Sequence, residues 1–375
     1  MEPLALHEKI FVAPAFLQDE NHGQIACQDC HGGDPADSDL STAHAGVVRD
    51  PTIRGAKDVC GDCHPDIVMR ATTSLHVTLE PFARMIGERA AAEPEVRAEV
   101  TAARKAHCGQ CHASCGQCHV ARPAYVGGGF LAGHLFLKTP PMREVCTACH
   151  GSRVENEFFG KNPGAPPDVH WRKRFMRCVD CHSGQEMHGN GLSPQDRYDK
   201  RDVPACLDCH QDIIEGSAPN AEQHLAHMHR VSCQACHSVA YKNCYNCHFA
   251  LDGNGFKYFK NERSEMDFAI GRNHRLSKDR LQEYVVLRHV PVAWDSFSFY
   301  VANGLQAFDA LPTWKLATPH NIQRRTPQNA QCSNCHGDKT LFLTPDRVAA
   351  GEAGANAPVV VSSELLPAAL EEKRP

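Results

Sequence analysis

The sequence predicts a mostly irregular and α-helical chain with very little sheet. All 20 cysteines of the 375 residues lie in ten copies of one short pattern, C-x-x-C-H. Ten copies leave fewer than 38 residues for each (375/10), too few for a segment to build a core of its own. The 27 glycines and 24 prolines also favour loops over long regular elements. We therefore expect a loop-rich chain wrapped around bound groups that supply much of its buried apolar surface.

Each pattern places a histidine directly after its second cysteine, and we number the patterns as motifs 1 to 10 in chain order. The cysteines are Cys27 and Cys30, Cys60 and Cys63, Cys108 and Cys111, Cys115 and Cys118, Cys146 and Cys149, Cys178 and Cys181, Cys206 and Cys209, Cys233 and Cys236, Cys244 and Cys247, and Cys332 and Cys335. The histidines are His31, His64, His112, His119, His150, His182, His210, His237, His248 and His336. No cysteine lies outside a motif.

Three chemistries could use these cysteines: disulfides, zinc, or covalently attached haem. A disulfide framework explains an even cysteine count, but it does not explain a histidine at one fixed offset. Zinc knuckles use paired cysteines without requiring a histidine directly after the second one. Covalent c-type haem requires the whole pattern, because two thiols bond the porphyrin and the adjacent histidine reaches the iron. The sequence thus favours ten covalently bound haem c groups and a haem-packed, elongated haem chain.

The other histidines are candidates for the second axial position of each iron. The chain has 24 histidines, so 14 lie outside the motifs (24 minus 10), against eight methionines. The candidate distal ligands are His22, His44, His76, His107, His134, His170, His188, His227, His229, His274, His289 and His320. Histidine at both positions lowers the haem potential relative to Met/His ligation and leaves no open site on the iron. This favours electron transfer over catalysis, and no catalytic residue is assigned.

The spacing of the motifs divides the chain into four consecutive parts. Residues 1–26 are a leader with candidate distal histidines, residues 27–248 hold nine motifs, residues 249–345 are motif-poor and contain motif 10, and residues 346–375 form a tail. The clearest helix is Pro81 to Lys105, interrupted at Pro94, and Tyr284 to Val292 has the pattern of a strand. We expect the tail to be mobile, or else to add a strand to a neighbouring subunit.

Motifs 3 and 4 start only seven residues apart. If one helix continues through both, His112 and His119 face the same side about 10.5 Å apart along the axis. A loop between them would break this geometry but keep the two haems neighbours. Motifs 8 and 9, which start eleven residues apart, would be separated by about 16.5 Å in the same way.

Charge and hydropathy limit the partners. The formal net charge is −5, and haem propionates make the loaded protein more acidic, so nothing indicates nucleic-acid binding. The basic run from Trp171 to Arg177 either pairs with propionates or is an ordinary solvated face.

No stretch approaches the ~20 apolar residues of a membrane helix. Residues 1–10 lack the features of a signal peptide. Because haem is attached to such thiols outside the cytoplasmic membrane, we expect a trimmed N-terminus and a periplasmic or extracellular protein.

The ten motifs resemble those of the multihaem cytochromes c, over residues 27 to 336. Ten haems on a chain of this length are similar to the periplasmic decahaem cytochromes of porin–cytochrome conduits. The resemblance implies respiratory or extracellular electron transfer, as a conduit subunit or a nanowire-like filament, with redox proteins or further copies of the chain as partners. The segment YKNCYNCH, which ends at His248, resembles octahaem reductases of nitrogen and sulfur oxyanions. The alternative is therefore a reductase with one open haem, although no motif has Lys in place of its final His.

Overall fold

A computed structural model describes residues 4–52, 56–108, 113–123, 126–194, 198, 203–246, 249–259, 263–276 and 281–370. Helices make up 38 % of it and strands 8 %, which confirms the predicted mostly irregular and helical fold with little sheet. The chain forms two compact units of non-consecutive segments. Unit 1 comprises Met1–Pro81, Cys108–Gly151 and Arg177–Val203, and unit 2 comprises Phe82–His107, Ser152–Met176 and Pro204–Pro375.

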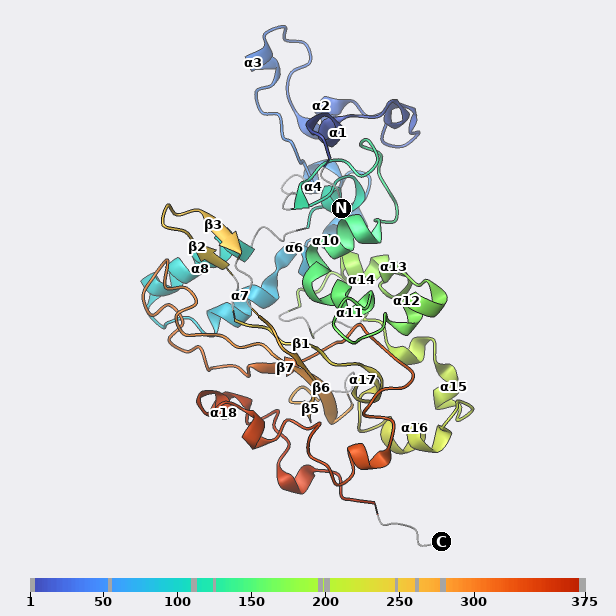
Figure 1. Ribbon diagram of the computed structural model, residues 1–375. Coiled ribbons are helices and arrows are strands. Elements are labelled where there is room, and N and C mark those ends of the chain that lie inside the picture. The colour runs from blue at the N-terminus through green and yellow to red at the C-terminus, as the bar shows by residue number, and fades with distance from the viewer. Residues whose placement is uncertain are drawn as a thin grey trace. The chain divides into compact units, whose positions relative to one another are not determined.

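Unit 1 is built from short helices joined by loops, coloured blue to green in Figure 1. Its helices are α1 (Leu6–Ile10), α2 (Cys27–His31), α3 (Leu40–Ala43), α4 (Ala56–Val59), α5 (Pro65–Ala71), α6 (Leu75–Thr78), α9 (Cys115–His119), α10 (Thr147–His150), α13 (Cys178–Cys181) and α14 (Gly184–His188). A 3₁₀ turn, η1 (Pro14–Gln18), and a π-helical turn, η4 (Met142–Cys146), adjoin them, and a second π-helical turn, η5 (Gly151–Glu155), belongs to unit 2 from Ser152 onward. Such short helices gain little from propensity, so tertiary contacts must hold them.

The predicted helix from Pro81 to Lys105 is present as two helices, which both lie almost entirely in unit 2. These are α7 (Glu80–Gly87) and α8 (Pro94–Cys108), and the break falls at Pro94 as expected. Proline at the first helical position lacks only an amide that would be unpaired there anyway. On α8 the buried residues are Val100, Ala103 and His107, which lie three and four positions apart on one face.

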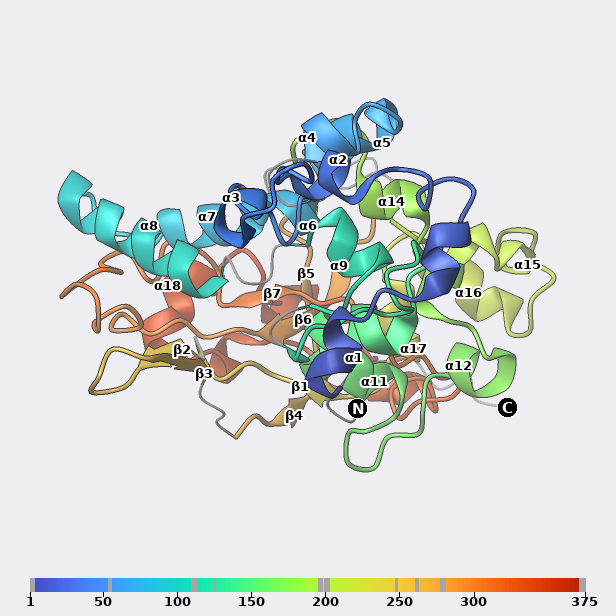
Figure 2. The same cartoon turned by 90° about the horizontal axis from the view of Figure 1, so that it is seen from above.

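The remaining helices of unit 2 are also short. They are α11 (Asn156–Phe158), α12 (Val169–Arg174), α15 (Gln211–Ile214), α16 (Ala221–His227), α17 (Cys233–His237) and α18 (Ala353–Asn356). The 3₁₀ turns are η6 (Cys206–Asp208), η7 (Cys332–Asn334), η8 (Pro345–Arg347), η9 (Ala350–Glu352) and η10 (Ser363–Leu365). Helices α15 and α16 pack as neighbours (Figure 2).

Unit 2 also contains the strands of the described residues. A three-stranded antiparallel sheet has the order β5 (Ala269–Arg272), β6 (Tyr284–His289) and β7 (Trp314–Leu316), and two-stranded pairs join β1 (Tyr241–Lys242) to β4 (Met266–Asp267) and β2 (Phe249–Leu251) to β3 (Lys257–Phe259). The strand predicted at Tyr284 to Val292 is thereby confirmed as β6. Its register sets Val286 opposite Ile270 of β5 and Leu287 opposite Leu316 of β7.

The core of unit 2 forms around this sheet and includes the C-terminal segment. Its buried members are Ala235, Tyr241, Ile270, Val286, Ala317, Phe342 and Val361. The amide of Val361 donates to the carbonyl of Leu343, and the carbonyl of Val359 accepts from Arg272. Gly271 makes room for this segment, since a Cβ there would collide with Leu287 and with the carbonyl of Val359. The structure thus packs the part of the tail around Val359 and Val361 on the chain's own sheet, where the red segment lies in Figure 1, in place of a mobile end.

The helix does not continue from motif 3 to motif 4. Helix α8 ends at Cys108, and Ser114 has extended backbone angles (φ −105°, ψ 166°). Its side chain caps α9 by accepting from the amide of Gln117, so a new helix starts at Cys115. Of the predicted alternatives, the continuous helix is therefore wrong. The spacing of His112 from His119 cannot be taken from a helix, and residues 109–112 lie outside the described part of the chain.

Candidate haem-binding site

Six of the motifs in the described part of the chain fold as single helical turns. Helices α2, α9, α13 and α17 and the turns η6 and η7 each begin at the first cysteine of a motif. In motifs 2, 6, 7 and 10 the amide of the motif histidine donates to the carbonyl of the first cysteine, over 2.8 to 3.0 Å. Residues three apart lie on the same side of such a turn, so both thiols of a motif face one way and can hold one porphyrin.

Seven motif histidines each lie opposite a histidine from a distant part of the same unit. The ring centroids are separated by 5.9 Å for His31 and His134, 6.2 Å for His64 and His22, 6.1 Å for His119 and His188, 6.3 Å for His150 and His76, 6.2 Å for His210 and His170, 6.2 Å for His237 and His224, and 6.1 Å for His336 and His227. One member of every pair follows a C-x-x-C pair of thiols. The narrow range of separations needs a common cause.

Two imidazoles on opposite sides of one metal ion would produce this spacing. With a metal–nitrogen bond of about 2.0–2.1 Å and about 1.1 Å from nitrogen to ring centre, the centroids lie about 6.3 Å apart. Aromatic rings in ordinary contact spread over about 4.5–7 Å between centroids, so it is the narrow range in all seven pairs that favours one shared geometry. The residues therefore fit a haem held by two thioether bonds and two axial histidines.

The second ring nitrogen of many of these histidines is held by the protein. Backbone carbonyls lie 2.6 to 3.1 Å from Nδ1 of five of them: Val48 for His31, Leu137 for His119, Gln323 for His237, Ala368 for His336 and Gln223 for His227. A carbonyl that accepts from Nδ1 leaves Nε2 as the free acceptor nitrogen, which is the nitrogen that binds metal. These backbone hydrogen bonds alone therefore orient the rings so that Nε2 faces the opposite histidine.

Burial keeps several of these imidazoles neutral. Desolvation lowers the pKa of His134, of His188 and of His237 below the ordinary histidine value, and neighbouring positive groups add to the effect. For His188 those groups are His119 and Arg70. Only the neutral imidazole has a free lone pair for iron, so the environment favours the form that ligates.

Thiols of different motifs lie close to one another. The thiol of Cys60 donates a hydrogen bond to Cys115, that of Cys178 donates to Cys146, and that of Cys206 donates to Cys233. In each pair this hydrogen bond lowers the pKa of the accepting thiol, Cys115, Cys146 or Cys233, to about 7. Electrostatic interactions further connect Cys30 with Cys60, Cys118 with Cys146, and Cys236 with Cys335. Neighbouring motifs therefore present their attachment atoms to each other.

Some predicted ligands fall outside the described residues, and others have surroundings of a different kind. Cys111, His112, Cys247 and His248 are not among the described residues. His44 is exposed, with Nδ1 2.9 Å from the carbonyl of Leu40, and His229 and His274 are exposed. His320 is half-buried, and its amide donates to Glu157. Nδ1 of His182 lies 2.8 Å from the carboxylate of Glu186.

The structure adds one histidine to the candidate ligands. His224 and His227 are three residues apart on α16, yet their rings lie opposite His237 and His336 respectively. Three histidines at 224, 227 and 229 precede motif 8, and the sequence marks only the cluster. The helical spacing is a signal in favour of His224 and His227, because residues three apart lie on one helix face.

His107, a predicted distal ligand, is buried beside an aromatic cluster in unit 2. It is 2 % exposed, and its Nε2 lies 2.7 Å from the hydroxyl of Tyr300. Its ring also contacts Phe249, with centroids 4.9 Å apart. Burial, with help from Lys257, lowers the pKa of His107, and burial raises that of Tyr300. The pair is a neutral hydrogen-bonded unit next to Cys108.

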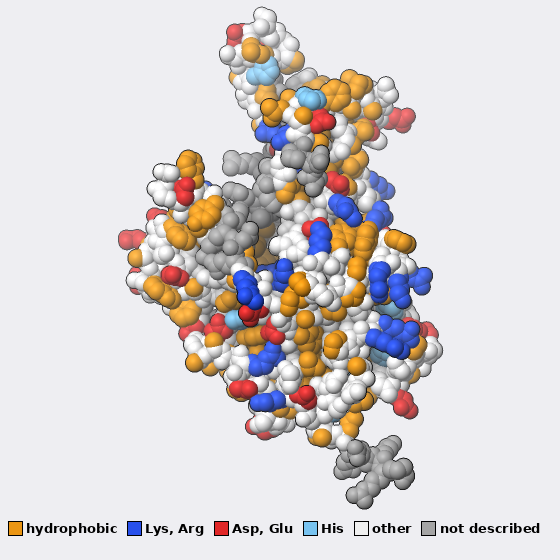
Figure 3. Space-filling view, in the orientation of Figure 1, with side chains coloured by type: hydrophobic (Ala, Val, Ile, Leu, Met, Phe, Trp, Pro, Cys, Tyr) orange, Lys and Arg blue, Asp and Glu red, His pale blue; other side chains and the backbone are white. Residues whose placement is uncertain are grey.

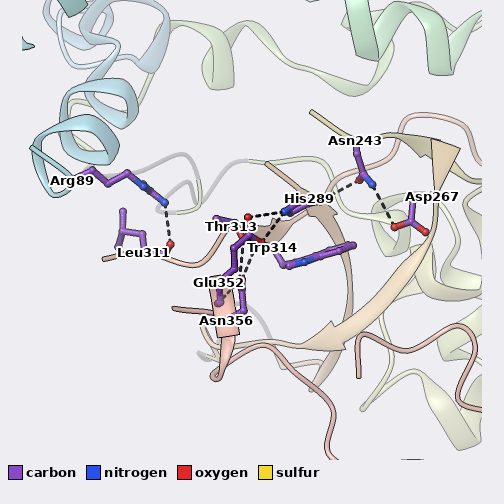
Figure 4. Close-up of polar contacts among 9 residues, drawn as sticks. All are labelled: Arg89, Asn243, Asp267, His289, Leu311, Thr313, Trp314, Glu352 and Asn356. Atoms are coloured by element: carbon purple, nitrogen blue, oxygen red, sulfur yellow. Dashed lines mark hydrogen bonds and ion pairs between the residues drawn. The ribbon is translucent and has the colours of Figure 1, made fainter. Parts of the chain in front are cut away.

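His289, another predicted distal ligand, lies at the end of β6 among polar groups (Figure 4). Its Nε2 is 2.9 Å from the carboxylate of Glu352, and its ring stacks on Trp314 with centroids 4.9 Å apart. The carboxylate of Glu352 also accepts from Thr313. The Nε2 of His289, the nitrogen that would bind a metal, is hydrogen-bonded to Glu352. Within the described residues, His289 does not lie opposite a motif histidine.

Other groupings were tested in the described residues. They contain no cluster of three or more His, Cys, Asp or Glu side chains suited to a metal ion. In the same residues we find no helix with the length and apolarity needed to cross a membrane. The basic residues of α12, Arg172, Lys173 and Arg174, are exposed, and Lys and Arg side chains gather over this region in Figure 3.

Comparison with known proteins gives one match. Residues 183–238 match the family of cytochrome c554 and c-prime, a segment that begins after motif 6 and contains motifs 7 and 8. No curated protein and no solved structure matches the chain significantly. The match covers a part of unit 1 with α14 and a part of unit 2 with α15 to α17. Together with the motifs, it supports a multihaem c-type cytochrome with covalently bound haem that takes part in electron transfer.

Proposed function

We propose that the chain carries ten covalently bound haem c groups and conducts single electrons along them. The observation that carries this proposal is the set of seven histidine pairs at 5.9 to 6.3 Å, each with one member in a C-x-x-C-H motif. Haem supplies reversible one-electron chemistry, which no side chain of the chain provides. The chain's own residues hold it, fix both axial positions and exclude other iron ligands.

Two axial histidines suit electron transfer better than catalysis. An iron closed on both sides changes charge without binding substrate, and bis-histidine ligation places its potential below that of Met/His ligation. The carbonyls that hold Nδ1 of His31, His119 and His237 keep these rings in place in both redox states. Because the ligands do not rearrange, each electron transfer has a low reorganisation energy.

The thiol contacts support haem chains within each unit. In unit 1 they connect motifs 1, 2 and 4, and then motifs 4, 5 and 6. In unit 2 they connect motifs 7, 8 and 10. Porphyrins attached to hydrogen-bonded thiols, or to thiols close enough to interact electrostatically, are near neighbours themselves. We infer the haem order 1–2–4–5–6 in unit 1 and 7–8–10 in unit 2.

The proposed place of action is the periplasm or the cell exterior, where haem is joined to such thiols. The partners are redox proteins or further copies of the chain, in a conduit or in a nanowire-like filament. Spare surface for a partner is available, since Leu6, Ile10, Phe11 and Phe175 are exposed at 82 %, 69 %, 58 % and 76 %.

The second candidate is a reductase of a nitrogen or sulfur oxyanion with one open haem. The His107–Tyr300 pair favours it, because a buried imidazole and a phenol beside Cys108 could deliver protons to a substrate. This candidate needs an open iron in one of the motifs for which no opposite histidine is assigned, which are motifs 3, 6 and 9.

Spin state and carbon monoxide binding distinguish the two functions. For the electron carrier we expect ten haems per chain, all low-spin in the oxidised protein, and no carbon monoxide adduct after reduction. His134→Ala provides the positive control, because it should open the haem of motif 1 and add one adduct per chain. One high-spin haem and one adduct in the unaltered protein would favour the reductase instead, and fewer than ten haems would contradict the haem count.

A further inference from the structure

Two of the described ligand candidates, His182 and His170, have a buried carboxylate beside Nδ1. Nδ1 of His182 lies 2.8 Å from Glu186, and Nδ1 of His170 lies 3.2 Å from Asp168. Both carboxylates are buried, with side chains 4 % and 3 % exposed. The Nδ1 atoms held by backbone carbonyls, such as those of His31 and His119, have neutral acceptors.

A third carboxylate helps to define what is unusual about these two. Asp19 lies 3.7 Å from Nδ1 of His22, but its side chain is 29 % exposed. Water and ions screen a charge in that position, and the distance is too long for a hydrogen bond. Glu186 and Asp168 act within hydrogen-bonding distance and at low dielectric, where a charge has a larger effect.

A negatively charged carboxylate that accepts the Nδ1 hydrogen changes how strongly the Nε2 lone pair is donated to the iron. The carboxylate draws the Nδ1 proton toward itself, so Nε2 becomes a stronger electron donor. A stronger donor stabilises ferric iron more than ferrous iron and lowers the reduction potential. The buried negative charge acts in the same direction, because it favours the more positive oxidation state of a nearby iron.

We propose that Glu186 and Asp168 are positioning residues that make the haems of motifs 6 and 7 the lowest-potential haems of the chain. The proposal rests on the proposed function, since it takes His182 and His170 as iron ligands. It adds that the chain is not an isopotential wire. Electrons occupy the other haems first and reach motifs 6 and 7 only near full reduction.

The two effects differ in size. Asp168 also accepts from the backbone amides of His170, Trp171 and Ile322, and these donors take up part of its charge. Its contact with the imidazole is also longer than that of Glu186. We therefore expect the haem of motif 6 to have the lower potential of the two.

The test uses isosteric neutral replacements, Glu186→Gln and Asp168→Asn, in the haem-loaded protein. In spectroelectrochemical titration, each should move one haem in ten out of the low-potential end of the curve. We expect a tenfold or larger change in its ratio of oxidised to reduced form for Glu186→Gln, equivalent to about 59 mV for one electron. The change for Asp168→Asn should be smaller.

Matched controls come from the same motifs. Asp180 and Asp208 precede the second cysteine of motifs 6 and 7, and their carboxylates bond Arg177 and the amide of Ala205, not an imidazole. Asp180→Asn and Asp208→Asn remove the same charge and should leave the low-potential end in place. Equal shifts in test and control variants would overturn the proposal, as would unchanged potentials in Glu186→Gln and Asp168→Asn.

Spectra separate this proposal from the proposed function. Low-spin signals from all ten haems, with no change of potential, would refute the role of the two carboxylates alone. A motif 7 haem that stays low-spin after His170→Ala would refute the ligand assignment on which both rest. Asp168 also caps α12, so Asp168→Asn can fail to fold. In that case Glu186→Gln alone decides the proposal. A low-spin signal retained by the His119–His188 haem then shows that α14, which carries Glu186 and His188, is still folded.

Discussion

His224 and His227 lie less than one helical turn apart on α16, yet they face two different motif histidines. Their rings lie 6.2 Å from His237 and 6.1 Å from His336. Under the proposed function, one short helix would serve two haems, those of motifs 8 and 10. An electrostatic interaction between the thiols of Cys236 and Cys335 connects the same two motifs. At the scale of the residue, a distal histidine is defined by its opposite ring and not by its distance along the chain from a motif.

The cluster at 224, 227 and 229 gives a direct test of this assignment. His224→Ala should convert one haem in ten from low-spin to high-spin and create one carbon monoxide site, because the iron of motif 8 loses its distal ligand. His229→Ala is the matched control, since His229 is exposed two residues after His227. Electron paramagnetic resonance of the oxidised protein measures the change. An altered spin state in the control, or none in His224→Ala, would show that the pairing is misassigned.

The cysteines and motif histidines could be assigned from sequence because thiol and imidazole are neighbours in the chain. The distal histidines could not be matched to motifs, because the pairing is set by packing over long distances in sequence. His31 and His134 are 103 residues apart (134 minus 31), and only the fold brings them together. His289 illustrates the other difficulty. Its apolar strand neighbours predict a strong partner, and the structure provides one in Glu352, a carboxylate 63 residues away.

At the scale of the element, local pattern was most informative where the chain is most regular. Pro94 marks the start of α8, and the β-branched run at Tyr284 marks β6. The tail was harder to interpret, because its residues from Val359 to Val361 are apolar within a polar, proline-containing sequence. Such a short run has no period that distinguishes a loose end from a core segment. Packing on β5 and on the loop after motif 10 decides the outcome.

Truncation of one side chain tests the packed tail. Val361 is fully buried in the sheet core, so Val361→Ala should lower the free energy of unfolding by about 1–3 kcal/mol, through lost burial and the cavity left behind. Val360→Ala is the control, because its side chain is only half-buried and points away from that core. Denaturant titration followed by the tryptophan and haem absorbance signals measures both. Equal effects of the two changes would mean that the segment is not packed on the sheet.

At the scale of the whole molecule, the two units differ in how much apolar core they own. Among its described residues, unit 1 buries four apolar side chains: Phe16, Val68, Val120 and Val145. Unit 2 has a sheet with a contiguous core of seven buried residues around Ile270 and Val286. Unit 1 holds the histidine pairs of motifs 1, 2, 4 and 5, and under the proposed function haem bound by these pairs takes the place of a core. Because conformational entropy opposes folding throughout, so small a core cannot hold unit 1 alone.

Removal of haem should therefore affect the two units unequally. We expect a haem-free chain, made without the attachment machinery, to lose nearly all amide protection in unit 1, because haem provides the surface on which its short helices pack. The β5–β6–β7 sheet of unit 2 should keep part of its protection, since its ladder and core are made by the polypeptide itself. Hydrogen–deuterium exchange with peptide-level mass spectrometry compares residues 115–150 with residues 269–289 in the loaded and haem-free proteins. A haem-free chain that protects both regions as the loaded one does would refute haem as the core of unit 1, whereas uniform loss in both would show that the sheet also depends on haem.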